Sequence, residues 1–157
     1  MKRYYIWMIA AILTLCGTMT LTSCGVEINN DEHGNPEEYQ AQIANTRWEL
    51  KEVMNHNNEW VSPEFFEGLD IPELSFRYNN SYVMRIATHA DRTDVTIING
   101  TYSIDSYFSI TMTDVNYQGI AYTLKVIYLN GNTLEGEFSI GKNPRRYNIR
   151  MKRFASE

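Results

Sequence analysis

Residues 120–140 read IAYTLKVIYLNGNTLEGEFSI, and this stretch decides the fold. We expect the longest strand at 120–129, and apolar and polar residues alternate within it from Tyr122 to Val126, which is typical of a strand with one buried face. Asn130-Gly131-Asn132 favours a tight turn, and the alternation resumes at Leu134. The stretch therefore predicts an antiparallel β-hairpin.

The same pattern extends in both directions from this hairpin. We expect further strands at 46–54, 74–78, 82–86, 95–97, 102–104, 108–112 and 147–154. In the first of them, Trp48, Leu50 and Met54 share the face that we expect to be buried. Asn99-Gly100 is the strongest short hairpin signal in the chain, so we place a turn there.

Consecutive hairpins make every strand antiparallel to its neighbours. The pattern gives about eight to nine strands and no long helix, and such a meander closes most easily into an up-and-down β-barrel. A two-sheet sandwich is the competing arrangement. We expect the all-β barrel because the hairpin signals are nearly continuous and long crossover connections are lacking.

A short helix is expected before the first strand. Asn35 is a favourable N-cap, Pro36 fits the first helical position, and the two glutamates that follow complement the helix dipole. We expect this helix to end near Asn45.

The N-terminus carries the parts of a secretory signal: Lys2 and Arg3, then a mostly apolar run to Cys16. The run is shorter than the roughly 20 residues that cross a membrane. Leu21-Thr22-Ser23-Cys24 resembles a bacterial lipobox, in which the cysteine is lipidated and becomes the first residue of the mature protein. The predicted organisation is a signal peptide at 1–23, a flexible tether at 24–35 and a barrel domain at 36–157.

The mature chain is acidic and has no cysteine pair. Cys16 would be removed with the signal, and Cys24 would carry lipid. Loss of Lys2 and Arg3 changes the formal net charge from −5 to −7. This balance argues against nucleic acid as a partner and against adsorption to anionic headgroups. Membrane attachment is therefore expected through Cys24. A single acyl chain anchors a protein only marginally, and the lipoprotein modification that the lipobox resemblance implies supplies several chains.

The sequence has no pattern typical of a metal site, a cofactor site or an enzyme. His33, His56 and His89 are far apart, without a second histidine or a cysteine at ligand spacing. No G-x-S-x-G motif and no glycine-rich phosphate loop is present. Paired carboxylates such as Glu64 and Glu67 would serve a glycosidase only if they flanked a cleft. We therefore expect no catalysis, no metal and no cofactor.

Aromatic residues, 13% of the chain, are the strongest positive signal. Eight lie on faces that we expect to be buried: Tyr78, Tyr82, Tyr102, Phe108, Tyr122, Tyr128, Phe138 and Tyr147. In the simplest interpretation these rings fill the core. An eight-stranded barrel can also hold one small ligand, and tyrosine offers an apolar ring with a polar tip. The candidate ligand-binding residues are Tyr78, Tyr82, Tyr102 and Tyr122 in the barrel, with Phe65 and Phe66 as lid residues at its mouth.

Thr46-Arg47-Trp48 resembles the Gly-x-Trp entrance motif of lipocalins, with Thr46 in place of the glycine. In that family a late basic side chain packs over the Trp ring, and the resemblance gives this role to Arg150 or Arg153. Residues 100–104 and 132–136 are similar to strand openings in lipocalin-like lipoproteins from Bacteroidetes-type bacteria. The resemblance implies a helix-plugged barrel, small hydrophobic ligands and an outer-membrane location, on the periplasmic or the surface face.

Two functions are consistent with these observations. The first is a lipid-anchored envelope barrel that binds a small apolar or amphipathic ligand. The second is an interaction module with a filled core, whose loops bind a protein or glycan partner at the cell envelope. A hydrolase is a distant third. The volume and polarity of the barrel interior would separate the first two.

Overall fold

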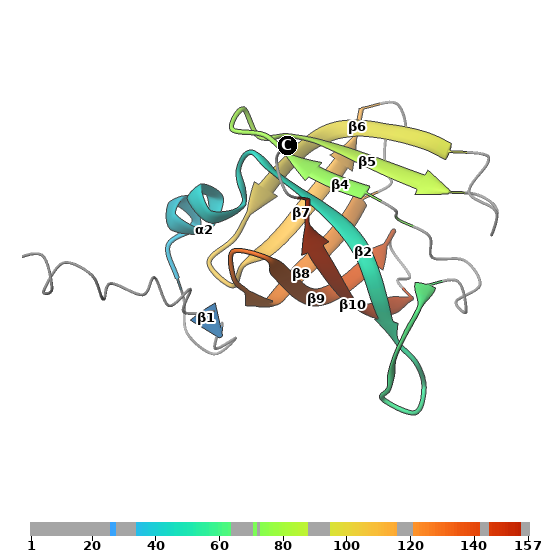
Figure 1. The fold of residues 1–157 in the computed structure, drawn as a ribbon. Coiled ribbons are helices and arrows are strands. Elements are labelled where there is room, and N and C mark those ends of the chain that lie inside the picture. Colours follow the sequence, from blue (N-terminus) through green and yellow to red (C-terminus); the bar gives the residue numbers. More distant parts are fainter. Residues whose placement is uncertain are drawn as a thin grey trace, which may run out of the picture.

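The computed structural model describes residues 26–27, 34–63, 71, 73–87, 95–115, 121–141 and 145–154. The expected all-β barrel is confirmed (Figure 1). The elements of these ranges are β1 (Val26–Glu27), α2 (Pro36–Ile43), β2 (Thr46–Met54), β3 (Trp60–Val61), β4 (Glu73–Phe76), β5 (Ser81–Ala87), β6 (Val95–Ile104), β7 (Ser109–Asp114), β8 (Ala121–Leu129), β9 (Thr133–Ile140) and β10 (Arg146–Arg153).

Closure of the barrel follows from the pairing of β2. This strand pairs antiparallel with β4 on one side and with β10 on the other, so the first and last barrel strands meet. Among the described residues, β2 and β4 to β10 form a closed antiparallel ring of eight strands. The two-residue strand β3 folds back on β2, outside this ring.

The helix α2 covers the end of the barrel at which β2 begins (Figure 1). Asn35 caps it as predicted, because its side-chain oxygen accepts a hydrogen bond from the backbone N–H of Glu37 at 3.0 Å. Tyr39 stacks on Phe108, with ring centroids 4.1 Å apart, and Ile43 is fully buried. The helix therefore plugs this end.

The two ends of the barrel differ in their connections. At the end covered by α2, here called the helix end, neighbouring strands are joined by short turns at 77–80, 105–108 and 130–132. At the opposite end, the loop end, residues 55–59 join β2 to β3, and the other connections include residues outside the described ranges. The predicted lid residues Phe65 and Phe66 are among those undescribed residues.

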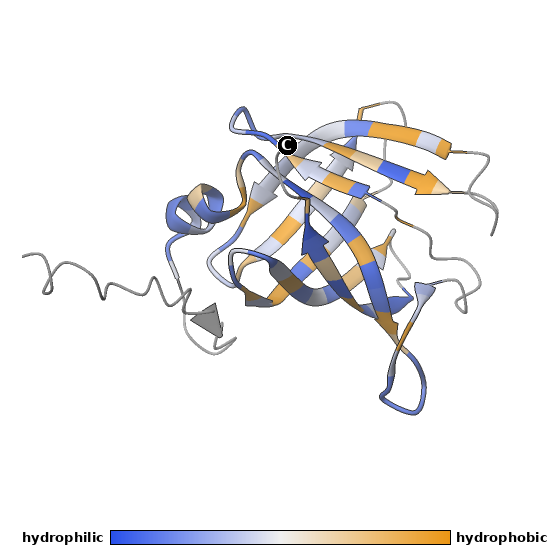
Figure 2. Ribbon diagram, viewed as in Figure 1, coloured by the Kyte–Doolittle hydropathy of each residue, from blue (hydrophilic) through white to orange (hydrophobic). Residues whose placement is uncertain are grey.

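The core lies inside the barrel, on one face of every strand. Hydrophobic and hydrophilic residues alternate along the strands (Figure 2). Burial of a large apolar side chain contributes about 1.5–3 kcal/mol. The barrel side chains with no measurable exposure are Val53, Met84, Phe108, Ile110, Met112, Leu124, Val126, Leu134, Phe138 and Met151.

Trp48 is buried at the helix end, as the sequence predicts. Its indole Nε1 donates a hydrogen bond to the hydroxyl of Thr46 at 2.7 Å, and this hydroxyl donates to the carbonyl oxygen of Ile43. Thr46 thus satisfies the indole N–H and joins β2 to the last turn of α2.

The predicted turn at Asn99-Gly100 is wrong, because β6 runs unbroken through both residues. A Cβ atom at Gly100 would lie 1.8 Å from the carbonyl oxygen of Thr113 and 2.6 Å from Cε1 of Tyr82. The glycine therefore permits a close backbone approach inside a strand rather than a turn. Two predicted strands merge into one as a result.

The expected inward position of Met54 is also wrong. The register between β2 and β10 shifts by one residue at Lys51, which forms a β-bulge. Beyond the bulge, Val53 occupies the buried position and Met54 is half-buried.

The strand β1 lies within the predicted tether and pairs with the end of β8. Val26 is opposite Leu129, and Glu27 is opposite Tyr128. This end of β8 leads into the turn at 130–132, so the chain reaches the barrel at the helix end. Cys24 and the predicted signal peptide lie outside the described residues.

Candidate functional site

A row of three residues crosses the barrel interior. Tyr82 on β5 is opposite Gly100 on β6, and Gly100 is opposite Asp114, the last residue of β7. Directly opposed residues of antiparallel strands share a face of the sheet. Tyr82 and Asp114 accordingly both lie on the inner face, and both are buried. Because Gly100 has no side chain, the Tyr82 ring can lie against its backbone.

Tyr122, the second residue of β8, lies in the same region. Burial raises the pKa of the Tyr82 and Tyr122 hydroxyls above their ordinary value, and the Asp114 carboxylate raises both further. Tyr122 adds to the increase in the pKa of Tyr82. The three side chains therefore share one electrostatic environment, in which both tyrosines are neutral at pH 7.

The Tyr82 hydroxyl has no hydrogen-bond partner within the described part of the chain, although the residue is only 1% exposed. A buried polar group without a partner costs about 1–3 kcal/mol. Nearly all such groups in folded proteins are paired with protein, water or ligand. The hydroxyl is therefore the group in this region with unused hydrogen-bonding capacity.

The row runs obliquely along the barrel. Asp114 at the end of β7 and Tyr122 at the start of β8 lie near the loop end, whereas Tyr82 is the second residue of β5, beside the 77–80 turn of the helix end. Toward the helix end, Phe108, Leu124 and Phe138 have no measurable exposure, so no space the size of a water molecule touches them. A ligand that enters from the loop end would meet Asp114 and Tyr122 first. It would have to displace neighbouring side chains to reach the Tyr82 hydroxyl, which has almost no accessible surface.

Tyr102 is buried as expected but is not part of the row. Its hydroxyl donates a hydrogen bond to the carbonyl oxygen of Arg77 at 3.0 Å, and its ring packs edge-on against Phe76 at 5.1 Å. Burial raises the pKa of the Tyr102 hydroxyl. These contacts hold the 77–80 turn against the barrel.

The prediction that Tyr78 faces the barrel interior is wrong. The strand β4 ends at Phe76, and Tyr78 lies in the following turn with 65% of its surface exposed. The alternation Leu74, Phe76, Tyr78 continues in the sequence beyond the point where the strand stops.

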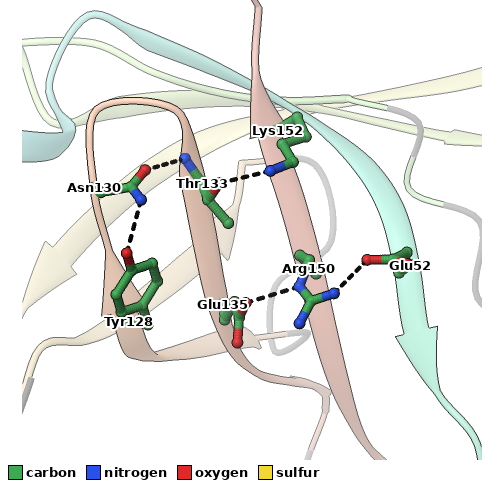
Figure 3. A network of polar contacts seen from close by, with 7 residues as sticks. All are labelled: Glu52, Tyr128, Asn130, Thr133, Glu135, Arg150 and Lys152. Atoms are coloured by element: carbon green, nitrogen blue, oxygen red, sulfur yellow. Dashed lines mark hydrogen bonds and ion pairs between the residues drawn. The ribbon is translucent and has the colours of Figure 1, made fainter. Parts of the chain in front are cut away.

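A second polar group lies on the outer face of β2, β9 and β10 (Figure 3). Arg150 donates hydrogen bonds to Glu52 through Nη1 at 2.6 Å and to Glu135 through Nε at 2.7 Å. Its guanidinium also lies 4.2 Å from the centre of the Trp60 ring on β3. Arg150 therefore links four strands and stabilises the junction that closes the barrel.

The expectation that Arg150 packs over the Trp48 ring is wrong. Trp48 points into the barrel whereas Arg150 points outward, so the arginine packs over Trp60 instead. Arg153 is the cross-strand neighbour of Trp48, and its side chain is exposed.

Sequence reasoning missed Asp114, because the predicted strand ended at residue 112. The signal was present, because the alternation of Ile110 and Met112 continues to Asp114 if the strand is extended by two residues.

Among the described residues, no three side chains of His, Cys, Asp or Glu gather as metal ligands. In the same ranges no helix is both long and apolar enough to cross a membrane. No family model, no curated protein and no solved structure matches the chain.

Proposed function

We propose that this chain is a lipid-anchored protein of the bacterial cell envelope whose barrel binds a small amphipathic ligand at Tyr82, Asp114 and Tyr122. The observation that carries the proposal is the buried Tyr82 hydroxyl without a hydrogen-bond partner. The protein acts by binding and not by catalysis, and it is held at the outer membrane through lipid on Cys24.

The chemistry of the row defines the ligand class. An ionised Asp114 accepts hydrogen bonds only, whereas a neutral Tyr82 both donates and accepts. A ligand with an N–H or O–H group would pair with them, and its apolar part would pack on buried apolar residues of the same face such as Ile98 and Met84. An anionic head group would be repelled by the Asp114 carboxylate. The preferred ligand is therefore neutral or cationic.

A fluorescence titration tests this site. The chain from Gly25 onward is titrated with N-phenyl-1-naphthylamine, a neutral apolar fluorophore with one N–H group. We expect saturable one-to-one binding. Tyr82→Phe should lower the affinity about tenfold, which corresponds to the free energy of one hydrogen bond. Tyr102→Phe is the matched control, because the Tyr102 hydroxyl is already bonded to Arg77. No saturable binding of any neutral or cationic amphiphile in a broad panel would refute the proposal.

The filled helix-end half of the barrel supports a second candidate function. Its fully buried side chains favour an interaction module that binds a protein or glycan partner at the envelope through its loops. Affinity capture from envelope extracts would then return one reproducible partner, whose binding is unaffected by Tyr82→Phe.

The membrane anchor is tested separately. Cells that express the full chain are fed an alkynyl palmitate analogue, which should label the wild-type chain. Cys24→Ser should remove the label and release the protein from the membrane fraction. Equal labelling of both chains would contradict lipidation of Cys24.

A further inference from the structure

The pairing of β1 determines which end of the barrel lies nearest to the anchor. Val26 is opposite Leu129, beside the turn at 130–132 of the helix end. Two residues span at most about 7 Å, so Cys24 lies within that distance of Val26 along the chain. If Cys24 carries lipid, as proposed above, the helix end is the part of the barrel closest to the bilayer.

Exposed aromatic side chains are found at this same end. Tyr78 in the 77–80 turn is 65% exposed, Tyr107 in the 105–108 turn is 42% exposed, and Phe154 after β10 is 37% exposed. The other large hydrophobic residues that are exposed in the described ranges are all aliphatic: Val95, Ile97, Val115 and Ile127. Tyrosine and tryptophan rings favour the headgroup region of a bilayer, where their apolar and polar parts are both satisfied.

The charges at the helix end are mixed. Arg47 lies over the Phe154 ring, 4.2 Å from its centre, and Arg77 is exposed beside Tyr78. The acidic residues Glu37 and Glu38 lie on the first turn of α2. Because neither sign dominates, the contact would depend on the aromatic side chains and the anchor, and not on attraction to anionic lipid.

We propose that the helix end docks on the headgroup region of the membrane that holds Cys24, with Tyr78, Tyr107 and Phe154 in the interface. The loop end, near which Asp114 and Tyr122 lie, is then directed away from the membrane. The proposed ligand site consequently exchanges with the aqueous space and not with the bilayer beneath the protein. This inference rests on the lipid anchor but not on the ligand.

The experiment uses the full lipidated chain in vesicles of phosphatidylethanolamine and phosphatidylglycerol. After removal of Cys16 and acylation of Cys24, one introduced cysteine is the single free thiol and is labelled with an environment-sensitive nitrobenzoxadiazole dye. Tyr78→Cys reports on the helix end, and Tyr107→Cys is a second reporter there. Ile97→Cys is the matched control at the loop end, because Ile97 is 55% exposed on β6.

The dye at position 78 or 107 should lose most of its fluorescence when nitroxide-labelled lipid is added, and the dye at position 97 should lose none. Three outcomes would overturn the docking proposal and leave the anchor intact. They are equal quenching at both ends, quenching at position 97 alone, and no quenching of a chain that floats with the vesicles. A chain that does not float with the vesicles would overturn the anchor and the docking together.

Discussion

Gly100→Ala is the substitution that tests the barrel geometry most severely. The new Cβ atom would lie 1.8 Å from the carbonyl oxygen of Thr113, whereas ordinary contacts begin at 3.4 Å. The strands β6 and β7 would have to separate locally by roughly 1.5 Å, which lengthens the hydrogen bonds beside the new methyl group.

The magnitude follows from these two effects. Loss of two backbone hydrogen bonds at about 1 kcal/mol each, with about 1–3 kcal/mol for overpacking, lowers the free energy of unfolding by about 3–5 kcal/mol. The methyl group would also approach Tyr82 Cε1 at 2.6 Å, so the ring must move and ligand affinity should fall as well.

The assay is urea denaturation of the chain from Gly25 onward, followed by the fluorescence of the buried Trp48. Gly141→Ala is the control. Nothing lies within 4 Å of its Cβ position, and its φ of +72° costs about 1–2 kcal/mol for a residue other than glycine. A loss below about 1 kcal/mol for Gly100→Ala, with an unchanged m-value, would refute the close approach of β6 and β7.

Three further predictions concern the helix, the closing junction and pH. Asn35→Ala removes the N-cap of α2 and should lower the free energy of unfolding by about 1 kcal/mol, measured by thermal denaturation. Arg150→Ala breaks the contacts with Glu52, Glu135 and Trp60 and should lower the free energy of unfolding by about 1–2 kcal/mol, measured by urea denaturation. Arg146→Ala, at an exposed position, should lower it by less than about 0.5 kcal/mol. The raised pKa of Tyr82 in the folded state means that its contribution to stability is complete below the unfolded pKa of about 10 and is lost as the pH rises through the folded pKa. The free energy of unfolding should therefore fall above about pH 10, and less steeply in Tyr82→Phe.

The strand pattern was readable from the sequence wherever local chemistry and tertiary structure agree. The Asn130-Gly131-Asn132 turn, the Asn35 cap and the buried Trp48 all belong to this class. The turn and the cap depend on residues a few positions away, and the burial of Trp48 follows from an alternation along its strand.

The errors occurred where the deciding contact comes from a distant strand. Asn99-Gly100 has the composition of a turn, but the glycine is required by the backbone of β7, which no local pattern reports. The bulge at Lys51 and the end of β4 before Tyr78 likewise depend on the register against neighbouring strands.

The candidate site was predictable only in part. Inward alternation identified Tyr82 and Tyr122 as buried, but their grouping with Asp114 depends on the tilt and register of four strands. Whether a buried tyrosine has a hydrogen-bond partner is decided by that same register, which is why Tyr82 and Tyr102 could not be told apart in advance.

The central claim is that the Tyr82 hydroxyl takes its missing partner from a ligand. Tyrosine labelled with carbon-13 at Cζ gives one resonance per ring, each assigned by a Tyr→Phe variant. On titration with N-phenyl-1-naphthylamine, the Tyr82 and Tyr122 resonances should shift and saturate together, and that of Tyr102 should not move. Resonances of Tyr82 and Tyr122 that stay fixed while the probe binds would contradict the claim.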